Sequence, residues 1–109
     1  MAQDFESTFA YKIQSGSFTT LLTSNSDDAV IGMRFANLHS GSITIDAKIT
    51  RSSVDYHLIK GAPIPAGGSL ELIDGGSKVV IMSGDVLKAR SSKTGSVDVA
   101  ISYIDSISE

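Results

Sequence analysis

The chain has 109 residues, no cysteine and a formal net charge of −3. This length holds one domain, and the absence of cysteine excludes disulfide bonds, thiolate nucleophiles and zinc–thiolate centres. The acidic balance argues against a nucleic-acid-binding protein, which would carry a basic face, and no segment approaches the about 20 apolar residues that cross a bilayer.

The first eight residues are predicted to be an arm that leaves the domain, which occupies residues 9–109. Phe5 and Phe9 would then contact a neighbouring subunit, or else they cover the domain's own core. The sequence leaves both alternatives open.

Two short strands follow. Alternation predicts the first over residues 9–14, with Phe9, Tyr11 and Ile13 on one face. The second covers residues 18–23, and the turn-forming side chains of residues 24–28 predict a loop.

The next two predicted strands carry much of the core. In residues 30–38, Gly32 indicates a β-bulge or a close backbone approach, and one face should carry Ile31, Met33 and Phe35. The clearest alternation in the chain covers residues 43–50, and its inward side chains are Ile43, Ile45, Ala47 and Ile49.

A further strand is predicted over residues 54–60, with Val54, Tyr56 and Leu58 on the buried side. Two prolines follow in residues 62–66. Proline has no N–H to donate to a sheet, so this segment is predicted to be an edge or a crossover between sheets.

The remaining strands are predicted over residues 69–73, 78–82, 86–91 and 97–104, separated by glycine-containing turns. No helical stripe of useful length is present. Eight or nine short strands predict an all-β fold, a single small antiparallel β-sandwich of the jelly-roll or immunoglobulin-like type.

The hydroxyl-rich composition bears on the surface. The chain contains 18 serines and seven threonines, and only 19% of its residues are charged. Short side chains lose little entropy when an interface immobilises them, so the composition favours an assembling surface, although serine and threonine are also common in β proteins.

The two histidines are the first candidates for chemistry. No HxH or HExxH spacing links His39 and His57, and no carboxylate stands at ligand spacing to both. We interpret them as surface residues. A pH-dependent contact between subunits stays open, because imidazole titrates near neutrality.

The loop carboxylates are the next candidates, as metal ligands. Asp27 and Asp28, with Ser24, Asn25 and Ser26, offer several oxygens on one loop, as a calcium site requires. The EF-hand pattern is missing, and the same residue types build ordinary turns. We therefore favour turns here and at Asp74 and Asp85.

Other site signatures are absent from the sequence. The glycines at 67–68 and 75–76 precede strands and lack the ending of a phosphate loop, and no Gly-x-Ser-x-Gly elbow is present. The chain has no tryptophan for a stacking platform. We expect no catalytic, cofactor-binding or metal-binding residues and no enzymatic activity. A basic cluster would form only if strands align the residues Arg51, Lys88, Arg90 and Lys93.

The ordered strand motifs resemble a known class. They follow an early Tyr-Lys-Ile strand and are IGMRFANL (31–38), ITIDAKI (43–49), DYHL (55–58), IPAGGSLE (64–71), SGDVLKA (83–89) and VDVAISYI (97–104). Their order and spacing, over about residues 9–104, resemble small β-sandwich virion structural proteins of tailed phages, especially those of marine and cyanobacterial hosts.

This resemblance implies a non-enzymatic, multicopy accessory component of the virion, assembled in the host cytoplasm. It would decorate or cement the capsid, or form part of the neck, tail or fibres. The implied partners are further copies of the chain in a homo-oligomer and other virion proteins. Residues 62–66 or the arm could add a strand to a neighbour.

Two other classes stay open as alternatives. A carbohydrate-binding or adhesin-like sandwich would need surface aromatics or a calcium loop, for which only Asp27 and Asp28 offer a start. A small barrel enzyme or ligand carrier would need polar groups that converge in a pocket, and the sequence displays none.

Overall fold

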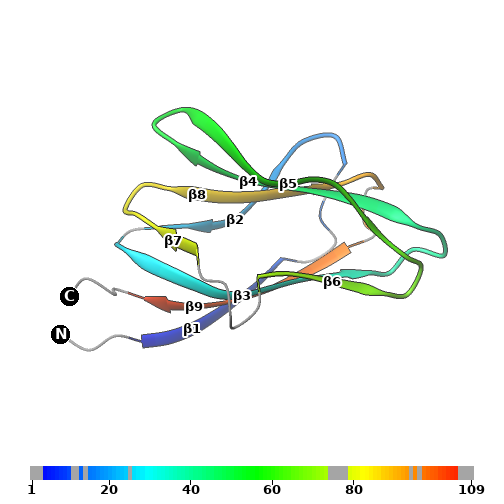
Figure 1. Ribbon diagram of the computed structural model, residues 1–109, viewed down its shortest axis with the longest axis horizontal. Helices are drawn as coiled ribbons and strands as arrows, with labels where there is room; N and C mark the ends of the chain where they lie inside the picture. The colour runs from blue at the N-terminus through cyan, green and yellow to red at the C-terminus, as the bar shows by residue number, and fades with distance from the viewer. Residues whose placement is uncertain are drawn as a thin grey trace.

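The computed structural model describes residues 4–10, 13, 15–24, 26–73, 79–93, 95 and 97–105. Within them, nine strands form two antiparallel sheets that face each other (Figure 1). The strands are β1 (Asp4–Ala10), β2 (Thr19–Thr23), β3 (Asp28–Asn37), β4 (Ile43–Arg51), β5 (Val54–Ile64), β6 (Ser69–Ile73), β7 (Val79–Ile81), β8 (Val86–Ser91) and β9 (Val97–Asp105). The predicted antiparallel β-sandwich is confirmed.

The strand order distinguishes the two predicted types of sandwich. One sheet has the order β1-β9-β3-β6, with β7 also paired to β3, and the other has the order β2-β8-β4-β5. An immunoglobulin-like sandwich would pair its first two strands in one sheet, whereas here β1 and β2 lie in different sheets and β1 pairs with the last strand. With the three-residue β7 set aside, this is the order of a jelly roll.

The core lies between the sheets. The inward face of β4 is as predicted, since Ile43, Ile45 and Ala47 are at most 2% exposed. Phe35 of β3 is fully buried and packs in the same cluster as Ile101 of β9.

The alternation predicted for β3 is correct only after a bulge. The pairing with β9 shifts between Val30 and Gly32, so Val30 is buried while Ile31 is only half-buried. A Cβ atom at Gly32 would lie 3.7 Å from the Ser102 Cβ, an ordinary contact. Of the two interpretations of Gly32, the bulge is therefore confirmed and the close approach is not.

The prediction for β5 was partly wrong. Val54 and Tyr56 point to the same side as their β4 partners Arg51 and Ile49, yet they are 50% and 57% exposed. Figure 1 shows the reason: the tip of the β4–β5 hairpin curls away from the facing sheet, so that sheet does not cover its inner side there. Leu58, farther from the tip, does pack against the core.

Residues 62–66, predicted to be an edge or a crossover between sheets, are both. Pro63 lies in β5, the edge strand of its sheet. The chain then passes through a turn, in which the Gly68 N–H donates to the Pro65 carbonyl, and enters β6 of the other sheet.

The amino-terminal prediction is corrected by β1. Residues 4–8, expected in the arm, pair with β9 in continuous register (Asp4 with Asp105 through Ala10 with Val99). Phe5 and Phe9 are 77% and 76% exposed, so they do not cover the core. Of the predicted strand 9–14, Ile13 is buried, and residues 11, 12 and 14 lie outside the described residues.

Candidate functional site

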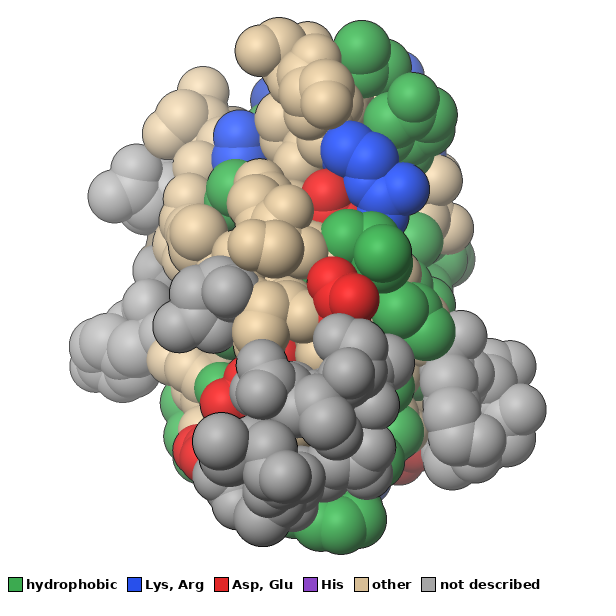
Figure 2. Space-filling model, turned by 90° about the vertical axis from the view of Figure 1, so that its left-hand side faces the viewer, with side chains coloured by type: hydrophobic (Ala, Val, Ile, Leu, Met, Phe, Trp, Pro, Cys, Tyr) green, Lys and Arg blue, Asp and Glu red, His purple; other side chains and the backbone are tan. Residues whose placement is uncertain are grey.

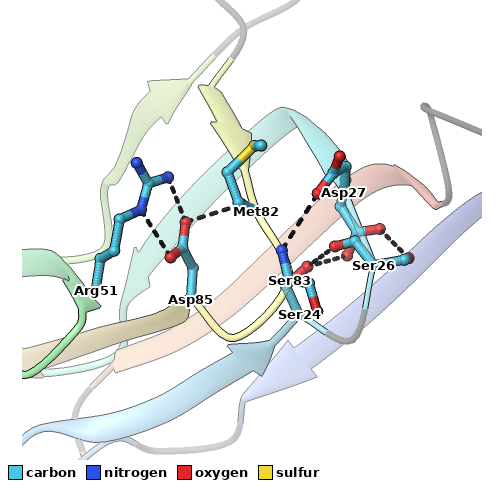
Figure 3. Close-up of polar contacts among 8 residues, drawn as sticks. Ser24, Ser26, Asp27, Arg51, Met82, Ser83 and Asp85 are labelled. Carbon is cyan, nitrogen blue, oxygen red and sulfur yellow. Dashed lines mark hydrogen bonds and ion pairs between the residues drawn. The ribbon is translucent and has the colours of Figure 1, made fainter.

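Buried polar groups tie together one end of the sandwich (Figures 1 and 3). This end holds the start of β1, the end of β9, the β2–β3 loop, the β4–β5 hairpin and the β7–β8 turn. Asp85, 2% exposed, accepts hydrogen bonds from Arg51 Nε at 2.8 Å and Nη2 at 2.6 Å. Its Oδ2 also accepts the Met82 N–H at 2.8 Å. The Arg51 hydrogen bonds, which outweigh the opposing effect of burial, hold the pKa of Asp85 below its ordinary value. This pair joins the hairpin to the turn.

The candidate calcium loop lies at the same end, and its two carboxylates diverge. Asp28 is 2% exposed and accepts the hydroxyls of Ser24 at 3.0 Å and Ser26 at 3.1 Å. Asp27 instead accepts the Ser83 N–H at 3.3 Å, as Figure 3 shows. Among the described residues, no three His, Asp or Glu side chains are grouped as metal ligands. Asn25 and Asp74 lie outside the described residues.

The two histidines lie in separate places. His39 follows β3, and its backbone N–H donates to Asn37 Oδ1 at 2.8 Å. His57 lies on β5, where its ring makes an edge contact with Phe18, 6.3 Å between centroids. They share no site.

A basic face is formed on the outside of the four-stranded sheet. The register places Lys48 of β4 directly opposite Lys88 of β8, and Asp46 opposite Arg90. Phe18 lies beneath both cations, with Lys48 Nζ 3.9 Å and Arg90 Cζ 4.4 Å from its ring centroid.

Acidic partners partly neutralise this face. Lys48 donates to Asp55 at 2.7 Å, and Arg90 donates to Asp46 at 2.9 Å. Burial raises the pKa of Asp46, but hydrogen bonds from Arg90 and the Gly61 N–H outweigh that effect and lower it. Of the predicted basic cluster, Lys88 and Arg90 share this face. Arg51 lies apart on Asp85, and Lys93 follows β8 in an exposed loop.

Sequence reasoning missed Phe18 and Lys48 in this face. The alternation of residues 43–50 already placed Lys48 outward, but its neighbours depend on strand order. No periodic signal in the sequence connects Phe18 to β4 and β8.

The two sheets carry opposite net charge. The strands of the four-stranded sheet contain five basic residues (Lys48, Arg51, Lys60, Lys88 and Arg90) and two acidic ones (Asp46 and Asp55). The strands of the five-stranded sheet contain one basic residue (Arg34) and six acidic ones (Asp4, Glu6, Asp28, Glu71, Asp98 and Asp105). The sandwich is therefore electrically polarised from one layer to the other.

Exposed apolar side chains gather in two places. Phe5 and Phe9 stand on β1, at one edge of the five-stranded sheet. Near the hairpin end, the exposed apolar residues are Val54, Tyr56, Val80 and Met82. Figure 2, which views this end of the molecule, shows apolar side chains along one side, next to basic and acidic ones.

A depression of about 250 Å³ lies on the outer face of the five-stranded sheet. Its charged groups, Arg34 and Glu71, pair with each other at 2.5 Å and are both half exposed. Gly32 and Ser102 line its floor. Its lining contains no histidine.

Comparisons with known proteins agree with the fold. The chain matches no protein-family model and no curated protein sequence. Among solved structures, it is similar to VP2 of infectious bursal disease virus, determined as a subviral particle, with a TM-score of 0.57 and 14% sequence identity. The match covers 95% of this chain and 33% of the VP2 chain, so this chain spans about a third of that protein's length. The fold is thus a β-sandwich like one found in a viral capsid protein. No helix among the described residues is long and apolar enough to cross a membrane.

Proposed function

We propose that this protein is a non-enzymatic structural component of a virus particle, present in many copies. The likeness to a viral capsid protein over 95% of the chain carries this proposal. The order of the strand motifs supports the finer assignment to tailed phages, as an accessory protein that decorates or cements the capsid or belongs to the neck, tail or fibres.

The surface is suited to this role. A component of a shell must bind neighbours through broad faces and edges, because symmetric assembly requires complementary patches and no pocket. This sandwich offers an acidic layer, a basic layer and a strand edge with two exposed phenylalanines. Opposite charges on the two layers would fix which face meets a charged partner.

Binding to particles tests the proposal. Purified protein would be mixed with capsids, necks and tails of the phage that encodes it, and its co-sedimentation would be followed at rising salt concentration. We expect saturation at a copy number set by the particle's symmetry, with ordered density in cryo-electron microscopy. The proposal would be wrong if the protein is absent from purified virions and binds none of these parts.

A double charge reversal on the basic, four-stranded layer, which contains Lys60 and Lys88, sharpens the experiment. Lys88→Glu with Lys60→Glu should weaken binding if this face meets an acidic surface. Arg34→Glu on the acidic layer is the matched control, and it should leave that binding unchanged. Circular dichroism would verify that all variants fold.

The carbohydrate-binding alternative retains one supporting observation, the exposed ring of Tyr56. Sugar recognition commonly uses such rings as stacking surfaces. A glycan array probed with and without calcium would favour this alternative if it shows selective binding that Tyr56→Ser abolishes.

A further inference from the structure

We propose that two copies of the chain pair through β1, antiparallel about a two-fold axis at Ser7, so that the two five-stranded sheets become one. The inference rests on the proposed function for the expectation that many copies lie close together. It names the surface through which they meet.

The sheet edges differ in how open they are to another strand. In the described part of the chain, β1 pairs only with β9, so alternate N–H and C=O groups of β1 face away from the sheet. Such an edge accepts another strand unless it is blocked by proline, bulges, charged side chains (lysine above all) or short length.

The other edges are blocked in these ways more fully than β1, whose only charged residues are Asp4 and Glu6. β5 carries Pro63, Lys60 and two register shifts. β2 has five residues and a register shift, while β6 and β7 have five and three residues. β1 has seven residues, no proline, no lysine and no register shift.

The side chains of β1 are arranged symmetrically about Ser7. Phe5 and Phe9 stand two residues before and two residues after Ser7. An antiparallel pair centred on Ser7 places Phe5 of one copy opposite Phe9 of the other, twice. Directly opposed aromatic side chains are among the pairs that stabilise sheets.

The other registers are less favourable. A two-fold axis perpendicular to the sheet must pass beside a residue, because opposed side chains point to the same face. Centring it on Glu6 would oppose two carboxylates, and centring it on Thr8 would oppose Phe9 to Ser7. The Ser7 register alone opposes all seven residues, and it sets Asp4 against Ala10 and Glu6 against Thr8.

The neighbouring strand β9 extends the match. Phe5 lies beside Ile104, and Phe9 lies beside Ala100. In the paired sheet, each apolar row would run from Ile104 through Phe5 to the second copy's Phe9 and Ala100. A row of serines, Ser102 and Ser7 from each copy, would separate the two apolar rows. The exposed phenylalanines would thus gain lateral contacts that the single chain lacks.

We infer that the occupant is a second copy because the side-chain pattern of β1 complements itself, with Phe5 opposite Phe9 and no carboxylate opposite another. A strand from a different virion protein could also add to this edge, and the experiment below separates the two cases.

Ser7→Cys tests the register. The chain has no cysteine. In the isolated protein, the introduced thiol can therefore form a disulfide only with the same thiol of a second copy. Opposed residues in an antiparallel pair have Cα atoms about 4.5–5.5 Å apart, within the range of about 4.4–6.8 Å that a disulfide spans. We expect rapid disulfide dimers of the isolated, folded protein under mild oxidation.

Ser102→Cys is the matched control. Ser102 is exposed on the same sheet face, one strand inward, directly beside Ser7. Its two copies would stand three strand spacings apart, about 14 Å, too far for a disulfide. Equal cross-linking of both variants would mean random collision and would overturn the proposal.

The phenylalanines are tested by sedimentation equilibrium of the isolated chain. Phe5→Thr with Phe9→Thr keeps β propensity and should raise the dimer dissociation constant by at least about tenfold, since aromatic side chains dominate such contacts. Val80→Thr, at the other apolar site, should not change it.

Two outcomes would overturn the pairing of copies. One is a strict monomer at all concentrations, and the other is a Ser7→Cys variant that cross-links in particles only to a different protein. Because the isolated chain is used for sedimentation, a monomeric protein that still binds particles would leave the proposed function intact.

Discussion

Asp85→Asn tests whether a buried carboxylate holds the hairpin end of the sandwich together. Asp85 is 2% exposed and accepts three hydrogen bonds, two from the Arg51 guanidinium and one from the Met82 N–H. Asparagine has nearly the same shape, but it is neutral and presents one acceptor oxygen where aspartate presents two. Its amide N–H₂ would face one of the donors.

The expected cost follows from these contacts. A hydrogen bond to a charged group contributes about 1.5–3 kcal/mol, and a buried donor without its partner costs about 1–3 kcal/mol. Arg51 is half exposed and can turn to water, which reduces the loss. We expect the free energy of unfolding to fall by about 2 kcal/mol at pH 7, or about 8 °C in Tm for a domain of about 100 residues.

The pH dependence supplies the decisive comparison. The pKa of Asp85 is lowered in the folded protein, below the about 3.9 of an unfolded aspartate. Its stabilisation is therefore complete above that value and is lost as the pH falls through the folded-state pKa. The difference between wild type and Asp85→Asn should be large at pH 7 and should shrink at pH 3.

Urea unfolding followed by circular dichroism measures this, because urea does not screen charges. Asp55→Asn is the control, since Asp55 is 43% exposed in its pair with Lys48 and exposed pairs contribute little. Equal unfolding midpoints for wild type and Asp85→Asn at pH 7, or an undiminished difference at pH 3, would refute the reasoning.

Three further substitutions test the fold. Asn37→Ala should lower the free energy of unfolding by about 2–3 kcal/mol in urea, because the buried Asn37 amide donates to the Ile64 and Pro65 carbonyls at 3.0 Å. Gly32→Ala should change it by less than about 1 kcal/mol, since the added Cβ makes only an ordinary contact; a loss as large as that of Asn37→Ala would show that the bulge is strained. Gly84→Ala, at φ +92°, should lower Tm with a loss of about 1–2 kcal/mol, and an unchanged thermal melt would contradict that backbone assignment.

Most strands could be predicted because alternation is a local signal. The predicted bounds of residues 69–73 and 86–91 are those of β6 and β8, and β9 extends one residue beyond its predicted end. The failures at β1 and β5 share one physical cause. Alternation reports that one face of a strand is apolar, but it cannot report whether another layer covers that face.

That cause explains β1 and β5 together. Val54 and Tyr56 alternate as core residues do, yet the hairpin curls away from the facing sheet and leaves them exposed. In β1 the apolar residues Phe5 and Phe9 are four apart and face outward, so the segment resembled an arm although it belongs to the sheet. The sequence search for chemistry considered Arg51 and Asp85 separately. Their pairing across 34 residues is set by the meeting of the hairpin with the β7–β8 turn.

The opposite net charge of the two sheets could not be predicted either, and this charge difference affects assembly. Most consecutive strands lie in different sheets. Charged residues that are interleaved along the chain are therefore separated in space, on one sheet or the other. A two-fold axis beside Ser7 would run perpendicular to the five-stranded sheet, and such an axis leaves both basic layers on the same side. The dimer would then present two basic faces to one acidic surface, and simultaneous contact of both would strengthen binding through effective concentration. Because charge contacts weaken as salt rises, binding by the dimer should depend more steeply on salt than binding by a Phe5→Thr, Phe9→Thr monomer.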